Sequence, residues 1–133
     1  MASIDPPVTG PVLDPETMQR LEELQKLVGN AQDVLGDLAR IFAADSVRYL
    51  AELHDAVEAA DGEAIGRLVH TLKGAALSVG AQRVSSFCLD AEMASRAGTA
   101  DHRAHHRALT QLVEEARNAL HAQAQSGPKP SRG

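Results

Sequence analysis

Hydrophobic residues recur every three or four positions along most of the chain, which is the spacing of amphipathic helices. Gly, Asp and Pro residues interrupt this pattern and mark where one helix ends and the next begins. No stretch shows the alternation of apolar and polar residues that is typical of strands. The pattern predicts helices over residues 15–28, 31–60 (with a break or only a bend near 44–46), 63–79 and 82–97, and a last helix that starts near 99–101 and runs to about 120.

The helix ends and the apolar faces follow from individual residues. Asp14 precedes Pro15 as an N-cap, and Asn30 is the expected cap of the second helix. Gly29 and Gly80 are expected to end helices. In the first two helices, the apolar positions that we expect to face the core are Leu21, Leu24, Leu27, Val28, Val34, Leu35, Leu38, Ile41, Phe42, Val47, Leu50, Leu53 and Val57.

The connections between these helices are short, and short connections make neighbouring helices antiparallel. The expected fold class is therefore all-α: an up-down antiparallel four-helix bundle with one or two additional short N-terminal helices. Pro, Gly and Ser are frequent at both ends of the chain. We therefore expect flexible tails at 1–12 and 123–133 on either side of a single domain at 13–122.

Composition narrows the class of protein. The chain has 133 residues, enough for one domain, and its 2% of aromatic residues argue against a β-sandwich or barrel. The formal net charge is -5 and no basic patch is visible, so nucleic acid is not an expected partner. Cys88 is the only cysteine, which excludes an intramolecular disulfide, and we expect it in the core. Because no apolar run reaches membrane-spanning length and no signal-peptide core follows Met1, we expect a cytoplasmic protein.

One segment, residues 63–80, carries a histidine that the helical pattern turns towards solvent. At about 100° per residue, His70 lies opposite the core stripe of this helix. Gly66 and Gly74 lie one turn before and one turn after His70, although a mid-helix glycine costs roughly 1 kcal/mol relative to Ala. The two glycines leave room for another protein to approach the imidazole. The core stripe consists of Ile65, Leu68, Leu72, Ala75 and Val79.

An exposed imidazole beside a fixed cation suits phosphoryl chemistry. A neutral imidazole is a competent nucleophile near physiological pH. Lys73 lies on the same helix face as His70 and brings an ammonium towards any anionic group that the imidazole receives. We therefore expect covalent capture of a phosphoryl group at His70.

Glu92 is expected to meet His70 from the next helix. His70 lies ten residues before Gly80 and Glu92 lies twelve residues after it, so an antiparallel turn brings the two close. A carboxylate that accepts a hydrogen bond from Nδ1 fixes the tautomer and leaves Nε2 free to attack. Arg96, one turn further along, is expected either to assist the phosphoryl group or to pair with Glu92.

The stretch His70-Thr71-Leu72-Lys73-Gly74, followed by Gly80-Ala81, resembles the HxLKGxxxxxGA signature of histidine-containing phosphotransfer (HPt) domains. The resemblance covers roughly residues 13–120. Further along, Cys88, Glu92 and Arg96 stand where HPt proteins often carry a Cys, a Gln or Glu, and an Arg. The departures are Ala75 and Ala76, where the family often has Ser, and Val69, where it commonly has Ala.

The resemblance implies a phosphoryl carrier rather than an enzyme with turnover of its own. His70 would accept a phosphoryl group from the aspartyl phosphate of a response-regulator receiver domain and pass it to another receiver. Lys73 would offset charge on the phosphoryl oxygens, and Glu92 would orient the imidazole. The residues expected to meet the receiver are Gly66, Arg67, Gly74, Leu77 and Arg96.

The resemblance also implies the partners, which are receiver domains and a hybrid sensor histidine kinase, without nucleic acid or membrane. The chain is expected to be a monomer with no cofactor of its own, and Mg²⁺ would come with the receiver. A docking module without phosphoryl transfer is the alternative, but such a module would not need the nucleophile. The sequence leaves open whether the chain is free-standing or the phosphoacceptor domain of a larger kinase.

Three more histidines, His102, His105 and His106, lie at the start of the last helix. His102 and His106 are four residues apart and so can chelate a metal ion. Asp101 is the only further ligand nearby, whereas structural zinc sites normally need four. We therefore expect no metal site and assign these histidines to covering one end of the bundle.

Overall fold

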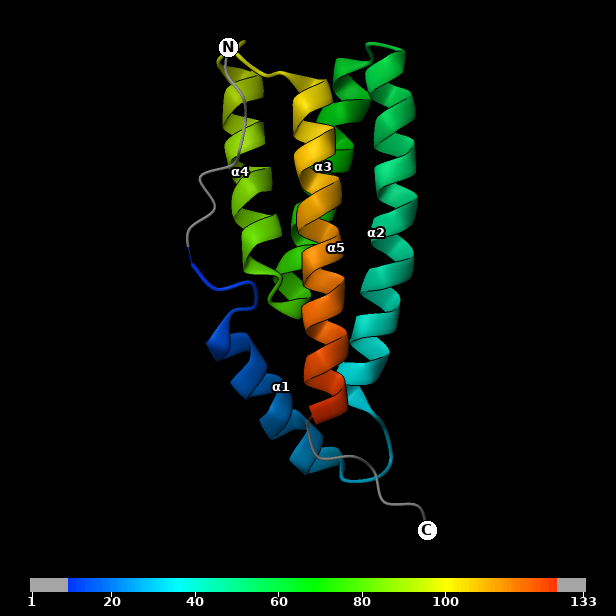
Figure 1. Ribbon diagram of the computed structural model, residues 1–133, viewed down its shortest axis with the longest axis vertical. Coiled ribbons are helices and arrows are strands. Elements are labelled where there is room, and N and C mark those ends of the chain that lie inside the picture. The colour runs from blue at the N-terminus through cyan, green and yellow to red at the C-terminus, as the bar shows by residue number, and fades with distance from the viewer. Residues whose placement is uncertain (1–9, 127–133) are drawn as a thin grey trace.

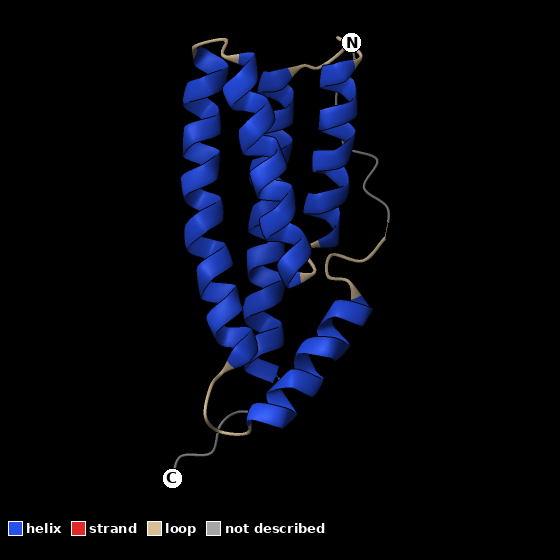
Figure 2. Ribbon diagram, turned by 180° about the vertical axis from the view of Figure 1, so that it is seen from behind, coloured by secondary structure: helices blue, strands red, loops and turns tan. Residues whose placement is uncertain are grey.

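The computed structural model describes residues 10–126, and the chain within that range is all-helical (Figures 1 and 2). Its elements are α1 (Pro15–Val28), α2 (Val34–Glu58), α3 (Gly62–Val79), α4 (Gln82–Arg96) and α5 (His102–Ser126). Helices α2 to α5 run alternately up and down as a four-helix bundle, and α1 is an additional N-terminal helix. The predicted fold class is confirmed.

Unequal helix lengths create the place that α1 occupies. Helices α2 and α5 have 25 residues each, whereas α3 has 18 and α4 has 15. The turn between α3 and α4 therefore lies well above the lower ends of α2 and α5, and both views show α1 beneath it. Helix α1 contacts α2 and substitutes for the missing lower parts of α3 and α4.

The segment before α1 is fastened to the α3–α4 turn. Leu13 forms an antiparallel bridge with Ala81, and the backbone N–H of Asp14 donates to the carbonyl of Gly80 over 2.8 Å. Gly80 adopts φ +72°, and a Cβ there would meet Thr17 Cβ at 2.9 Å. A side chain at position 80 would therefore be strained by its backbone and would also push α1 away from the turn.

Four of the five helices begin at an aspartate that accepts a hydrogen bond from a backbone N–H of the first turn. These aspartates are Asp14, Asp33, Asp61 and Asp101. The prediction of Asn30 as the cap of α2 is wrong, because α2 starts after Asp33. No break interrupts the chain near 44–46, because α2 is continuous from Val34 to Glu58.

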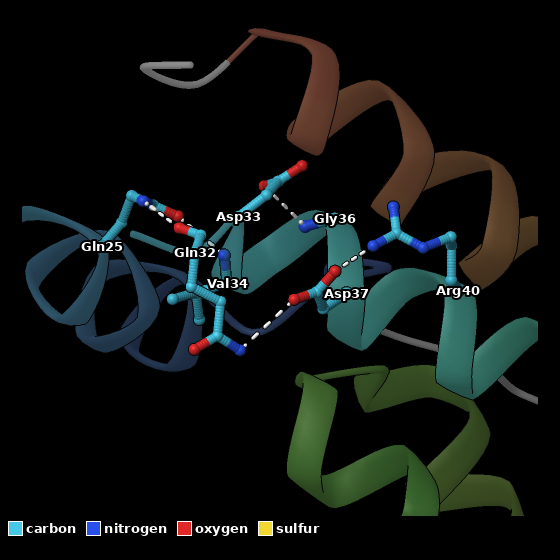
Figure 3. Close-up of polar contacts among 7 residues, drawn as sticks. All are labelled: Gln25, Gln32, Asp33, Val34, Gly36, Asp37 and Arg40. Carbon is cyan, nitrogen blue, oxygen red and sulfur yellow. Dashed lines mark hydrogen bonds and ion pairs between the residues drawn. The ribbon is translucent and has the colours of Figure 1, made fainter. Parts of the chain in front are cut away.

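The loop between α1 and α2 is organised by the buried side chain of Gln25 (Figure 3). Its Nε2 donates to the carbonyls of Gly29 at 2.9 Å and Gln32 at 2.7 Å, and its Oε1 accepts from the N–H of Val34 at 2.8 Å. Of the three bound groups, the N–H of the buried Val34 is the one that would otherwise be buried unpaired. The bonds of Gln25 also explain why the helix starts late: the N–H of Val34 is bound by Gln25.

The core forms where all four bundle helices meet. Its most completely buried large side chains are Phe42, Leu72, Leu109, Leu120, Val84, Val113 and Cys88. The predicted core stripe of α3 contained Ala75, but Ala75 is only half-buried. Ala76, the next residue, is fully buried and takes its place in the core.

Four residues expected in the core are instead exposed, namely Leu24, Leu27, Ile41 and Val47. Helix α1 contacts the bundle along one narrow face that buries Thr17, Met18 and Gln25, so its leucines at 24 and 27 face outwards. The apolar face of α2 is wider than the part of its surface that α3 and α5 cover, so Ile41 and Val47 are left exposed.

The ends of the described range differ from the expected tails. The carbonyl of Val12 accepts from the N–H of Gln82, and that of Gly10 accepts from Arg83 Nε, so residues 10–12 are bound to α4. Helix α5 extends through residue 126, four residues into the expected C-terminal tail. The remaining tail residues, 1–9 and 127–133, lie outside the described range. No helix within residues 10–126 is long and apolar enough to cross a membrane.

Candidate functional site

His70 projects from the middle of α3 into solvent, and 71% of its side-chain surface is exposed. A Cβ added at either Gly66 or Gly74 would meet no atom within 4 Å. The imidazole therefore stands between two bare helical turns. Nothing in the described fold uses this space, so it is available to an approaching molecule.

Glu92 of α4 joins His70 to Lys73. His70 Nδ1 lies 3.0 Å from Glu92 Oε2, and Lys73 Nζ lies 2.5 Å from Glu92 Oε1. The left-handed Gly80 allows α4 to return along α3, which brings residues 70 and 92 together as their spacing predicts. Glu92 and Lys73 are 16% and 21% exposed, whereas His70 is open to solvent.

The charge of Glu92 determines which nitrogen of His70 is free. Burial raises the pKa of Glu92, but hydrogen bonds from Lys73 and His70 outweigh burial and hold its pKa below the ordinary value. An ionised carboxylate can only accept hydrogen bonds, so the contact with His70 puts the ring proton on Nδ1. The lone pair of Nε2 then points into solvent.

The other predicted site residues lie around this group without binding it. Arg67, Leu77 and Arg96 are exposed, with Leu77 60% exposed. Both carboxylate oxygens of Glu92 are engaged by His70 and Lys73, and within residues 10–126 no ion pair joins Glu92 to Arg96. Lys73, expected to be free for a phosphoryl group, is bound to Glu92.

Two exposed apolar residues of α4 escaped the sequence analysis. Leu89 is 46% exposed and Met93 is 57% exposed. At about 100° per residue, both lie within roughly a quarter turn of Glu92, on the side away from the buried Cys88 and Ala91. Their four-residue spacing was a usable signal. We call Leu77, Leu89 and Met93 the apolar rim.

The three histidines at the start of α5, His102, His105 and His106, lie in two different environments. His102 and His105 line a small cavity together with Gly66, Glu92 and Ser95, whereas His106 Nε2 lies 2.9 Å from the carbonyl of Leu50 on α2. His105 contacts Phe87 edge-on, with 5.5 Å between ring centroids, and burial followed by the charge of His102 lowers its pKa.

Neither these histidines nor Cys88 forms a metal site or a reactive centre. No group of three His, Cys, Asp or Glu side chains in residues 10–126 has the arrangement of a metal site. Cys88 is fully buried, and burial raises the pKa of its thiol to about 12. The thiolate that a reactive cysteine needs is therefore absent at neutral pH.

Comparisons with known proteins agree with one another. The family model for the Hpt domain matches residues 37–119. A histidine-containing phosphotransfer protein from maize has a similar structure, with a TM-score of 0.76 and 25% identity over 86% of this chain and 83% of that one. Histidine-containing phosphotransfer protein B from Pseudomonas aeruginosa has a TM-score of 0.73 and 23% identity, over 90% of this chain and all of that one. No curated protein matches the chain by sequence.

Proposed function

The chain belongs to the Hpt domain family, and on that premise we propose that His70 is its phosphoacceptor. It is a histidine phosphotransfer protein of phosphorelays, and such proteins are phosphocarriers. We propose further that the phosphoryl group comes from the aspartyl phosphate of one receiver domain and leaves to the aspartate of another. A hybrid sensor histidine kinase stands at the start of the relay.

The observation that carries this proposal is the contact between His70 Nδ1 and Glu92 on an otherwise bare helix face. With the proton held on Nδ1, Nε2 attacks phosphorus as its bond to the aspartyl oxygen breaks, and the aspartate leaves as a carboxylate. The ring becomes cationic and keeps its Nδ1 proton. Phosphoryl transfer needs mainly alignment and charge stabilisation, so this simple site is sufficient.

Lys73 supplies positive charge beside the phosphoryl group. An ammonium has three donors, and in Lys73 one of them is directed at Glu92. The other two are available for phosphoryl oxygens when a receiver docks. We expect Mg²⁺ to arrive with the receiver and to neutralise charge on the same oxygens.

The surface around His70 suits a receiver domain. Gly66 and Gly74 leave space for close approach, and the apolar rim offers side chains that docking would remove from water. Arg67 and Arg96 lie at the flanks, where their charges suit the acidic phosphorylation site of a receiver. We propose that the chain presents this surface as a monomer.

The test is phosphoryl transfer from a panel of labelled, phosphorylated receiver domains to the wild-type chain and to its His70→Gln variant. We expect an acid-labile, base-stable label on the wild type and none on the variant. The matched control is His121→Gln, which removes an exposed histidine of α5 and should leave labelling intact. If the His70→Gln variant is labelled, a residue other than His70 is the phosphoacceptor. Docking without any label would support an adaptor.

A further inference from the structure

A groove runs between α2 and α5, on the face of the bundle opposite His70 (Figure 1). His70 and Glu92 come from α3 and α4, the other two helices of the bundle. We propose that the groove binds one amphipathic helix of a partner protein, acidic towards its N-terminus and basic towards its C-terminus. A helix bound there leaves His70 accessible, so this inference is independent of the proposed function.

The groove consists of two adjoining hollows of about 390 and 620 Å³, and Arg117 lines both. Every residue that lines them belongs to α2, to α5 or to Asp33, the cap of α2. On α2 the lining extends from residue 36 to residue 55, which corresponds to about 30 Å of helix. A partner helix of about 20 residues matches this length.

The floor of the groove is apolar and partly open to water. Val47 is 50% exposed and Ala51 is also exposed, and both line the same hollow as the buried Val113. In the other hollow, Ala39 and Ala43 of α2 are too short to keep a second helix at a distance. A helix with an apolar face would cover these side chains and remove them from water.

Charged side chains divide the groove into a basic part and an acidic part. The hollow of 620 Å³ is bordered by Arg40 and Arg117, and its one carboxylate, Asp33, is used as the cap of α2. The hollow of 390 Å³ adds the carboxylates of Asp55 and Glu114. Helices favour acidic residues near the N-terminus and basic residues near the C-terminus. The partner helix therefore lies with its N-terminal end over Arg40 and its C-terminal end over Asp55.

The charges along the groove are available to a partner. Within residues 10–126, no ion pair involves Arg117 or Glu114. Arg40 binds Asp37 through one guanidinium nitrogen, and a guanidinium has further donors. The side chain of Asp55 is 87% exposed, with the ring of the adjacent histidine 3.6 Å away. Four charged side chains can thus pair with a docked helix in a fixed order.

The shape of the groove favours a single helix over a second copy of this chain. In a symmetric dimer, each chain presents the same surface to the other. Two hollow surfaces placed face to face would leave the floor, including Val47, without close contacts. The convex surface of one helix fills the groove along its length, which agrees with a monomeric chain.

The test uses the full chain and two synthetic helices of 21 residues that differ only in the order of their charges. Both have Ala and Leu along one face and the same covalent staple on the opposite face, so both are helical. The first has Glu in its N-terminal half and Lys in its C-terminal half, and the second has the reverse order. Fluorescence anisotropy measures their affinities for wild type, Val47→Glu and Ile41→Glu.

Ile41→Glu is the matched control, because Ile41 is 56% exposed on the same helix but does not line the groove. Circular dichroism checks that the three chains are equally helical. Sedimentation of the wild type and Val47→Glu, without peptide, measures their oligomeric state.

We expect the first peptide to bind the wild type about tenfold more tightly than the second, because only the first meets opposite charges at both ends. Val47→Glu places a charge on the apolar floor and should weaken binding about tenfold or more, whereas Ile41→Glu should bind like the wild type. Equal affinities of the two peptides, equal affinities of the two variants, or no binding of either peptide overturns the proposal. A wild-type dimer that Val47→Glu dissociates also overturns it and assigns the groove to a second copy. None of these outcomes changes the acceptor role of His70.

Discussion

Two polar side chains, Gln25 and Glu92, each bind more than one group of the molecule, and they do so in opposite ways. Gln25 is neutral, is 9% exposed and binds three backbone groups of the α1–α2 loop. Glu92 is charged and binds two side chains, of which His70 is open to solvent. The first network is closed and serves the fold. The second ends at the reactive Nε2 of His70 and serves phosphoryl transfer. Mutations in the first network should therefore change stability, and mutations in the second should change phosphoryl labelling.

The sharpest separation is expected at His70. His70→Gln should abolish phosphoryl labelling completely, because no other nucleophile stands at the site. Since the side chain is exposed, the free energy of unfolding should change by no more than about 0.5 kcal/mol. Labelling and urea unfolding of the same preparation measure both. A large loss of stability would mean that His70 belongs to the fold.

Gln25→Ala should show the reverse. The variant leaves the buried N–H of Val34 without its acceptor, so the free energy of unfolding should fall by about 2 kcal/mol, with labelling of the folded protein unchanged. Gln32→Ala is the control, because that side chain makes only an exposed hydrogen bond to Asp37. If urea unfolding finds the two variants equally stable, the closed network does not hold α1 in place.

A side chain at position 74 should stabilise α3, and a large one should also hinder the approach of a receiver. In this exposed helix interior, Gly74→Ala should raise the free energy of unfolding by about 1 kcal/mol, because Ala loses less backbone entropy. The bulkier Gly74→Gln should weaken receiver binding in a titration. Gly62→Gln, at the first position of α3, is the control and should bind normally. Undiminished binding by Gly74→Gln would show that the space beside His70 is not used.

The smallest effect concerns pH. Burial lowers the pKa of His105 in the folded chain, whereas the unfolded chain has the ordinary value of about 6.5. The unfolded state therefore binds more protons as pH falls below that value, and the folded state should lose stability in this window. In His105→Gln, the free energy of unfolding should depend less steeply on pH. Urea unfolding above and below pH 6.5 measures this dependence. If the pH dependence of the free energy of unfolding is the same in the variant and the wild type, other titratable groups cause it.

Local sequence pattern predicted the bundle and the approach of Glu92 to His70, because both depend on helix periodicity and one short turn. It failed where a distant side chain decides the outcome. Asn30 and Asp33 are both reasonable caps, and the choice follows from Gln25, a residue of the preceding helix. The pairing of Lys73 with Glu92 was missed for the same reason, since it depends on which partner reaches the second carboxylate oxygen.

The fastening of Leu13 to Ala81 also has a consequence during protein synthesis. The two residues are separated by roughly seventy positions, so α1 leaves the ribosome long before the α3–α4 turn that holds it exists. At about 5–20 residues per second, this delay is on the order of several seconds, far longer than a helix needs to form. The first helix to be made thus waits for a turn that is made several seconds later, and its exposed Leu24 and Leu27 are available to chaperones throughout the wait.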